Sequence, residues 1–134
     1  MLERFAAATD VNQREIIAYA LGMGRERAGG AWLLDRLDDA RLSRLDRQHV
    51  LFGLTEEPAT RDAALAWVET HLNLLSRQGV RAAVISLADN ACSAADAQSW
   101  NGALGPRVGS DANARLLLDA SLEKIRNCAA LRAK

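Results

Sequence analysis

The chain has 134 residues, and its 17 basic and 17 acidic side chains cancel at neutral pH. This length suits one ordinary domain with a core of its own, so we expect a single helical domain over residues 1–134. The positive charges are neither in excess nor clustered, which gives no electrostatic reason for binding nucleic acid or an anionic membrane surface. We therefore expect neither as a partner. No apolar run approaches the length of a membrane-spanning helix. The sequence does not indicate the cellular compartment, because a targeting signal would lie in the missing N-terminus if the chain is a fragment.

The composition favours helices throughout. Alanine, leucine and arginine are abundant, proline occurs only twice, and no segment alternates apolar and polar residues over the length of a strand. Seven or eight helices joined by short loops predict an all-α fold of stacked antiparallel helix pairs, a HEAT- or armadillo-like right-handed superhelix. This prediction rests on the succession of helices, since no strict repeat period is present.

Residues 1–60 contain three predicted helices after a first segment. Residues 1–8 read as the end of an earlier helix. Asp10 is expected to cap a helix to about Leu21, which Gly22 and Gly24 end. Further helices are expected over residues 26–37 and 40–54. The first of these three helices is expected to bury Ile16, Ile17, Ala20 and Leu21.

Residues 61–78 form the clearest amphipathic pattern and predict a central helix. Thr60 is a candidate N-cap, and Gly79 stands where a left-handed C-cap residue belongs. The apolar face repeats at helical spacing, so we expect it to be buried. Its members are Ala64, Trp67, Val68, His71, Leu72 and Leu75.

In the last part of the chain, the sequence contains an apolar segment over residues 80–89 and predicts two more helices. Ser93 is expected to cap a helix to about Leu104, with Asp96 at the reciprocal capping position. Gly105, Pro106 and Gly109 are expected to form a break, and Ser110 or Asp111 to start the terminal helix. One face of that helix gathers Ala114, Leu118, Ser121, Leu122, Ile125 and Ala129.

No residue pattern indicates an active site. His49 and His71 lie 22 residues apart without the HExxH spacing of a zinc protease, so we interpret both as packing residues. No serine lies in a G-x-S-x-G motif. Cys92 and Cys128 have no CxxC spacing; we expect both to be reduced and partly buried, with a reactive thiol at Cys92 as the alternative. The three tryptophans are expected to be core anchors: Trp32, Trp67 and Trp100.

Three stretches resemble a known family, the gluzincin zinc aminopeptidases of the puromycin-sensitive and endoplasmic-reticulum type. The central stretch is similar to the A-x-x-W-x-[FL]-x-x-[NH]-W-[DN]-x-L signature of their C-terminal helical domain, with Leu72 in place of the usual Trp. The residues that carry this similarity are Ala64, Trp67, Val68, His71, Leu72, Asn73 and Leu75. Arg61 stands where the family has its GR. The stretch before it resembles the family's lR-x-[QL]D-x-x-x-V-[LF]-x-G helix, and the last resembles the x-L-E-x-I-R-x-N tail. The first of these two similarities is carried by Arg44, Leu45, Asp46, Val50, Leu51 and Gly53. The tail similarity is carried by residues 121–128. After the tail, the family has a W-L pair, whereas this chain has Ala129, Ala130 and Leu131.

This resemblance implies that the chain is a C-terminal fragment of a larger zinc aminopeptidase. The zinc and the catalytic residues would lie in a separate catalytic domain, so we expect no catalytic residue, cofactor or peptidase activity in this chain alone. Its partners would be that catalytic domain and the peptide substrate, whose cavity it would shape or gate. The alternative is a free-standing HEAT-like interaction scaffold. A peptide carboxylate would be attracted by a surface bearing Arg36, Arg41, Arg44 and Arg47.

Overall fold

A computed structural model describes residues 7–8, 10–23, 27–76 and 82–133, and these contain helices and no strand. The predicted all-α fold is therefore confirmed over this part of the chain. The helices form two compact units, Met1–Leu75 and Ser76–Lys134, here called unit 1 and unit 2. The single domain and the handedness of a superhelix stay predictions.

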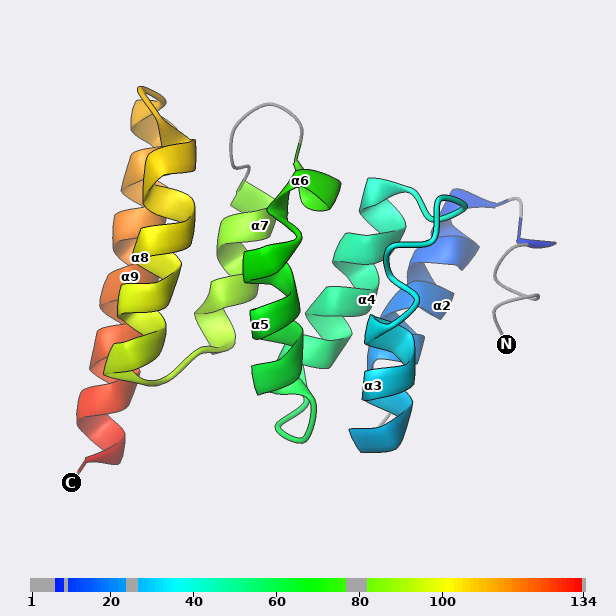
Figure 1. The fold of residues 1–134 in the computed structure, drawn as a ribbon, viewed down its shortest axis with the longest axis horizontal. Coiled ribbons are helices and arrows are strands. Elements are labelled where there is room, and N and C mark those ends of the chain that lie inside the picture. The colour runs from blue at the N-terminus through cyan, green and yellow to red at the C-terminus, as the bar shows by residue number, and fades with distance from the viewer. Residues whose placement is uncertain (1–6, 9, 24–26, 77–81, 134) are drawn as a thin grey trace. The chain divides into compact units, whose positions relative to one another are not determined.

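Unit 1 contains α2 (Val11–Gly22), α3 (Arg27–Leu34), α4 (Arg44–Glu56), α5 (Arg61–Thr70) and the short α6 (Leu72–Leu75) (Figure 1). Asp10 caps α2 as predicted, because its carboxylate accepts a hydrogen bond from the backbone N–H of Gln13 at 2.8 Å. The predicted helix end over residues 1–8 lies largely outside the described residues, as do Gly24 and Gly79.

Helices of unit 1 pack on their second neighbours along the chain. α2 packs against α4, and α3 packs against α5. α2 runs parallel to α4, since Arg14 near its start bonds to Asp46 near the start of α4, and Tyr19 bonds to Glu56 at the end of α4. Parallel contact between alternate helices is the arrangement of stacked helix pairs.

Two glycines let α2 and α4 approach to backbone contact. A Cβ on Gly22 would lie 2.9 Å from the Cα of Gly53, and one on Gly53 would lie 2.8 Å from the Cα of Gly22. Such distances leave no room for a side chain at either position. Gly22 is therefore buried in the α2–α4 contact rather than a simple helix stop, and α2 extends through it.

The prediction for the inward face of α2 was partly wrong. Ile16 is 68% exposed and Ala20 is exposed, whereas Ala18 is fully buried. Ile17 and Leu21 are half-buried. α2 carries apolar residues nearly all round, so periodicity did not decide which face α4 would cover.

α4 begins later than predicted, at Arg44 instead of residue 40. Ser43 is its N-cap and forms a capping box, in which the Ser43 hydroxyl accepts from the N–H of Asp46 and the Asp46 carboxylate accepts from the N–H of Ser43. A capping box satisfies two backbone donors that the first turn otherwise leaves open. This local pairing fixes the start of α4.

The prediction of one continuous central helix over residues 61–78 was wrong. α5 ends at Thr70, and His71 has a non-helical backbone (φ −118°, ψ 26°) before α6 begins. The Nδ1 atom of His71 lies 2.9 Å from the carbonyl oxygen of Trp67 and 2.8 Å from the Thr70 hydroxyl. Thr60 is not a side-chain cap either, because its hydroxyl donates to the carbonyl oxygen of Leu54 at 2.8 Å. The buried face still includes Ala64, Val68, Leu72 and Leu75.

Unit 2 contains α7 (Ala82–Leu87), the 3-10 turn η1 (Ala88–Asn90), α8 (Ala94–Val108) and α9 (Ala112–Arg132) (Figure 1). Ser93 caps α8 as predicted, and of Ser110 and Asp111, the two candidates for the start of the terminal helix, Asp111 is the N-cap of α9. The break predicted at Gly105 and Pro106 was wrong, because α8 continues through both to Val108. Pro106 lies in the last turn of α8, and the positive φ that ends the helix is at Gly109 (54°).

α8 and α9 pack together as an antiparallel pair, with α7 and η1 on α9. Trp100 of α8 is 1% exposed and is the largest fully buried side chain of this unit, which confirms it as a core anchor. The buried face of α9 holds Ala114, Leu118, Ser121, Leu122 and Ile125, and Ala129 is half-buried.

Candidate functional site

The four arginines predicted to contact peptide lie on or beside the connection between α3 and α4, here called the arginine turn (residues 35–47). Backbone hydrogen bonds from Arg36 to Leu33 and from Asp39 to Arg36 curl this segment into successive turns. Arg36, Arg41 and Arg44 are exposed on it, and Arg47 is buried. The structure therefore separates one of the four from the other three.

Arg47 holds the arginine turn together from inside. Its side chain is 7% exposed, and its guanidinium donates to the carbonyl oxygens of Leu37 at 2.5 Å and Asp39 at 2.9 Å. Buried backbone carbonyls need such donors, because an unsatisfied one costs free energy. The guanidinium of Arg47 is thus bonded to backbone carbonyls of the turn and stabilises its fold.

Arg41 is bound to a carboxylate of the same turn. Its guanidinium and its backbone N–H both donate to Asp39, with an Nη2–Oδ2 distance of 2.6 Å. The side-chain hydrogen bonds from Arg41, followed by its backbone hydrogen bond, lower the pKa of Asp39 to about 2. A peptide carboxylate would compete with Asp39 for this guanidinium.

Arg36 covers the exposed face of Trp32. The guanidinium carbon lies 4.2 Å from the ring centroid, and the Arg36 Nη1 donates to the carbonyl oxygen of Trp32 at 3.1 Å. Trp32 is 42% exposed, so the prediction that it is a core anchor was wrong. Trp32 and Arg36 present a stacked cation–π pair on the surface, a pairing common at protein interfaces.

The histidines lie apart and have separate packing partners. The Nε2 of His49 lies 3.5 Å from a carboxylate oxygen of Glu15, and the ring of His71 stacks on Trp67 with centroids 4.1 Å apart. In the described part of the chain, no three His, Cys, Asp or Glu side chains gather where they could hold a metal ion.

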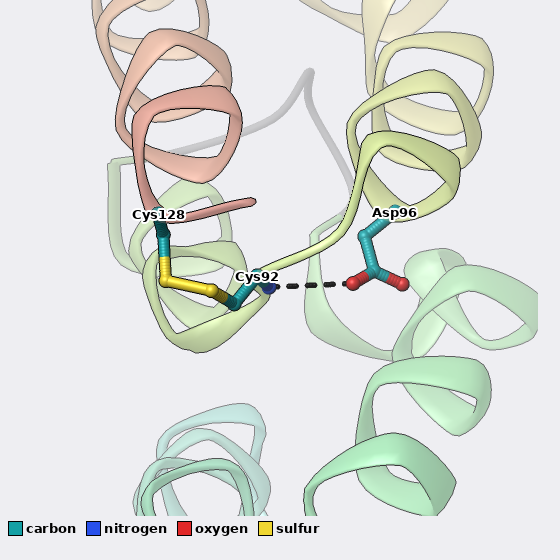
Figure 2. The surroundings of a disulfide bond; sticks show 3 residues. All are labelled: Cys92, Asp96 and Cys128. Atoms are coloured by element: carbon teal, nitrogen blue, oxygen red, sulfur yellow. Dashed lines mark hydrogen bonds between the residues drawn. A yellow bond between two sulfur atoms is a disulfide. The ribbon is translucent and has the colours of Figure 1, made fainter. Parts of the chain in front are cut away.

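Cys92 and Cys128 form a disulfide, so the prediction that both are reduced was wrong (Figure 2). Their Cα atoms lie 5.2 Å apart although 36 residues separate them in sequence. The bond ties the loop before α8 to the last third of α9, and the backbone N–H of Cys92 donates to Asp96 at 3.3 Å. An even number of cysteines was the one signal for this bond in the sequence, and it does not reveal proximity.

A groove that the sequence did not reveal lies between α7 and α9 in unit 2. It has a volume of about 390 Å³ and is open to solvent. Asp89 at its rim accepts hydrogen bonds from the Ser121 hydroxyl at 2.8 Å and from the Lys124 ammonium at 3.0 Å. The floor and walls are mainly small or apolar residues, namely Ala82, Ala83, Ile85, Leu117 and Ala120.

Asp46 connects α4 to α2 and predicts a dependence of stability on pH. Burial alone would raise its pKa, but hydrogen bonds from Arg14, at 2.8 Å, and from Ser43 outweigh burial, so the pKa is lowered from 3.8. Because the pKa is lower in the folded state, ionised Asp46 stabilises unit 1 above about pH 4, and this contribution is lost as pH falls through the lowered pKa. We expect Asp46→Asn to cost about 1–2 kcal/mol at pH 7 and less at pH 3, measured by urea unfolding. An equal cost at both pH values would contradict this origin.

Comparison of the chain with protein-family models, with curated proteins and with solved structures finds no match. The resemblance to zinc aminopeptidases therefore stays a prediction. Within the described ranges, no helix has both the length and the apolar character needed to cross a membrane.

Proposed function

We propose that this chain is a non-catalytic C-terminal helical domain of a zinc aminopeptidase, which packs on the catalytic domain and shapes or gates the peptide cavity. The observation that carries the proposal is that apolar residues of the stretches resembling the family's signatures are buried in the helices. Ala64, Val68, Leu72 and Leu75 of the central stretch are at most 3% exposed. Leu122 and Ile125 of the tail stretch are buried in unit 2.

Arg61, where the family has the Arg of its GR, has a structural role that fits this reading. Its Nε donates to the carbonyl oxygen of Thr55 at 2.9 Å, and its Nη2 donates to that of Glu56 at 3.0 Å. These carbonyls lie at the C-terminal end of α4, where a helix leaves its last acceptors open. Arg61 thereby closes the connection from α4 to α5, which supports reading this motif as structural.

The gating role would belong to the exposed part of the arginine turn. Arg36 and Arg41 lie on the connection before α4 and Arg44 is the first residue of α4; all three are exposed, and a peptide carboxylate is a matching ligand for a guanidinium group. Arg47 is excluded from this role because its guanidinium is bonded to the carbonyls of Leu37 and Asp39. The candidate peptide-contacting surface thus contains three of the four arginines proposed from the sequence.

The gating role is tested by the double substitution Arg36→Ala and Arg41→Ala in the full-length polypeptide. We expect KM for long peptides to rise about two- to fivefold, as exposed charge pairs are worth little, with KM for a single aminoacyl amide unchanged. Arg126→Ala, which removes an exposed arginine of α9, is the matched control. An unchanged KM for long peptides in the double variant would contradict peptide contact at this turn.

A free-standing interaction scaffold is the second candidate, and the groove between α7 and α9 favours it. Small and apolar residues line this groove, and Leu117 at its wall is 45% exposed. Concave apolar surfaces of helix-pair proteins commonly bind partner segments. Under this alternative, the natural polypeptide would lack a catalytic domain.

A further inference from the structure

The disulfide of unit 2 joins two segments that differ in how else they are held. Cys92 lies in the short connection between η1 and α8, and Cys128 lies near the C-terminal end of α9 (Figure 2). Both cysteines are half-buried, so the bond lies at the edge of this unit and outside its fully buried core. Disulfides that solvent can reach are the ones that reductants open most easily.

The Cys92 side is held by hydrogen bonds that do not involve sulfur. The Ser93 hydroxyl accepts a hydrogen bond from the backbone N–H of Asp96 at 3.0 Å. The Asp96 carboxylate in turn accepts one from the backbone N–H of Cys92 at 3.3 Å (Figure 2). This pairing satisfies backbone donors at the start of α8. Breaking the disulfide leaves these bonds intact, so the start of α8 keeps its cap.

The rest of unit 2 also has contacts that are independent of the disulfide. Asp89 of η1 accepts hydrogen bonds from the Ser121 hydroxyl at 2.8 Å and the Lys124 ammonium at 3.0 Å, which hold η1 on α9. Trp100 of α8 and Leu118 of α9 are at most 1% exposed and lie in the core of the unit. These contacts should keep α8, α9 and η1 together in the reduced protein.

The end of α9 has no comparable support. Ile125 is fully buried, and no residue of α9 after it is buried. Cys128 and Ala129 are half-buried, and residues 130–132 are exposed. So short a helical segment is marginal by itself in water, because most helix stability in proteins comes from packing. Among the described residues, the disulfide is thus the main tertiary restraint on α9 after Ile125.

We propose that the Cys92–Cys128 disulfide is a redox-sensitive switch for the end of α9. A dithiol reductant opens the bond and releases residues 126–133, while the rest of unit 2 stays folded. First, a thiolate of the reductant attacks one Sγ atom, and the other Sγ leaves as a thiolate and takes up a proton. The second thiol of the reductant, as its thiolate, then attacks the mixed disulfide and frees the other cysteine. Two electrons thereby pass from the dithiol to the protein, and the reductant becomes a disulfide.

The same contacts make the switch reversible. After reduction, the capped start of α8 keeps Cys92 in place, and the buried Ile125 anchors α9 within one turn of Cys128. The two thiols therefore stay close together, and their effective concentration remains high. An oxidant should restore the same bond. The switch does not depend on the aminopeptidase resemblance.

The switch is tested by amide hydrogen exchange of the 134-residue chain, measured by NMR before and after reduction with dithiothreitol. We expect the amides of residues 128–130 to exchange about tenfold faster in the reduced protein, because the helix frays back toward Ile125. The amides of residues 98–104 in α8 should be unchanged, and reoxidation should restore slow exchange. The double variant Cys92→Ser and Cys128→Ser is the control, with fast exchange at residues 128–130 that does not respond to dithiothreitol.

The kinetics of reduction separate a local switch from a bond that is reduced only after unfolding. We expect millimolar dithiothreitol to open the disulfide without urea, at a rate proportional to its concentration. Trp100 fluorescence, recorded in a Trp32→Phe, Trp67→Phe background, should keep its folded value. Three results would overturn the proposal: reduction that requires urea, a shift of Trp100 fluorescence to that of the unfolded chain, or equal exchange of residues 128–130 in both redox states.

Discussion

Loss of the Cys92–Cys128 disulfide is expected to lower the free energy of unfolding of unit 2 by about 3–4 kcal/mol. The bond closes a loop across a sequence separation of 36 residues, which restricts the unfolded chain, and its Cα–Cα distance of 5.2 Å lies within the usual range. We would measure urea unfolding with and without dithiothreitol. Trp100 fluorescence reports unit 2 in a Trp32→Phe, Trp67→Phe background.

The double substitution Cys92→Ser and Cys128→Ser is the control for this experiment. It should reproduce the loss seen with dithiothreitol, and its unfolding midpoint should not respond to the reductant. A wild-type midpoint that is the same with and without dithiothreitol would contradict a stabilising disulfide. Because such bonds persist in oxidising compartments, we also expect the protein to fold in one.

Gly53→Val is expected to destabilise unit 1 by about 3 kcal/mol or more. A Cβ at Gly53 would lie 2.7 Å from the carbonyl oxygen of Tyr19 and 2.7 Å from the carbonyl carbon of Gly22. Both neighbours are backbone atoms of α2, so the two helices must move apart and lose the packing around Ala18. The loss is measured by the free energy of urea unfolding at pH 7.

Gly29→Ala in α3 is the matched control in the same unit. Among the described residues, no atom outside the neighbouring backbone of α3 lies within 4 Å of a Cβ built at Gly29. Alanine there should stabilise the helix by about 0.5–1 kcal/mol, because glycine loses more backbone freedom on folding. If Gly53→Val is as stable as the wild type, then α2 and α4 do not make the backbone contact described here.

Local signals in the sequence predicted much of the helical framework. Asp10 and Ser93 cap the helices that they were expected to cap, and Asp111 was one of two candidates for the cap that it forms, because an N-cap side chain acts on backbone groups two or three residues away. The buried face of α9 follows its apolar periodicity. Such features depend on neighbours in sequence, which the sequence shows directly.

Features that depend on tertiary contacts were not predicted. The helix breaks at His71, whose ring nitrogen Nδ1 lies 2.9 Å from the Trp67 carbonyl oxygen, within a stretch whose apolar periodicity continues unbroken. The exposed position of Ile16 follows from which face of an apolar helix α4 covers. Pro106 suggested a break, yet a proline in a last turn removes only one hydrogen bond from the helix.

The candidate site shows the same division between local and tertiary information. The four arginines were proposed as a peptide-contacting surface because of their charge, but the sequence could not show that Arg47 turns inward to the carbonyls of Leu37 and Asp39. The disulfide and the groove between α7 and α9 each join segments more than 30 residues apart. A single sequence carries no signal for such pairings.

The most direct test of the central claim is to sequence the genomic reading frame upstream of Met1. The proposed function predicts an open frame of several hundred codons that encodes a HExxH motif and a GxMEN loop, the zinc-binding and substrate amino-terminus motifs of the aminopeptidases that this chain resembles. A stop codon and a promoter directly before Met1 would contradict it and leave a free-standing helical module.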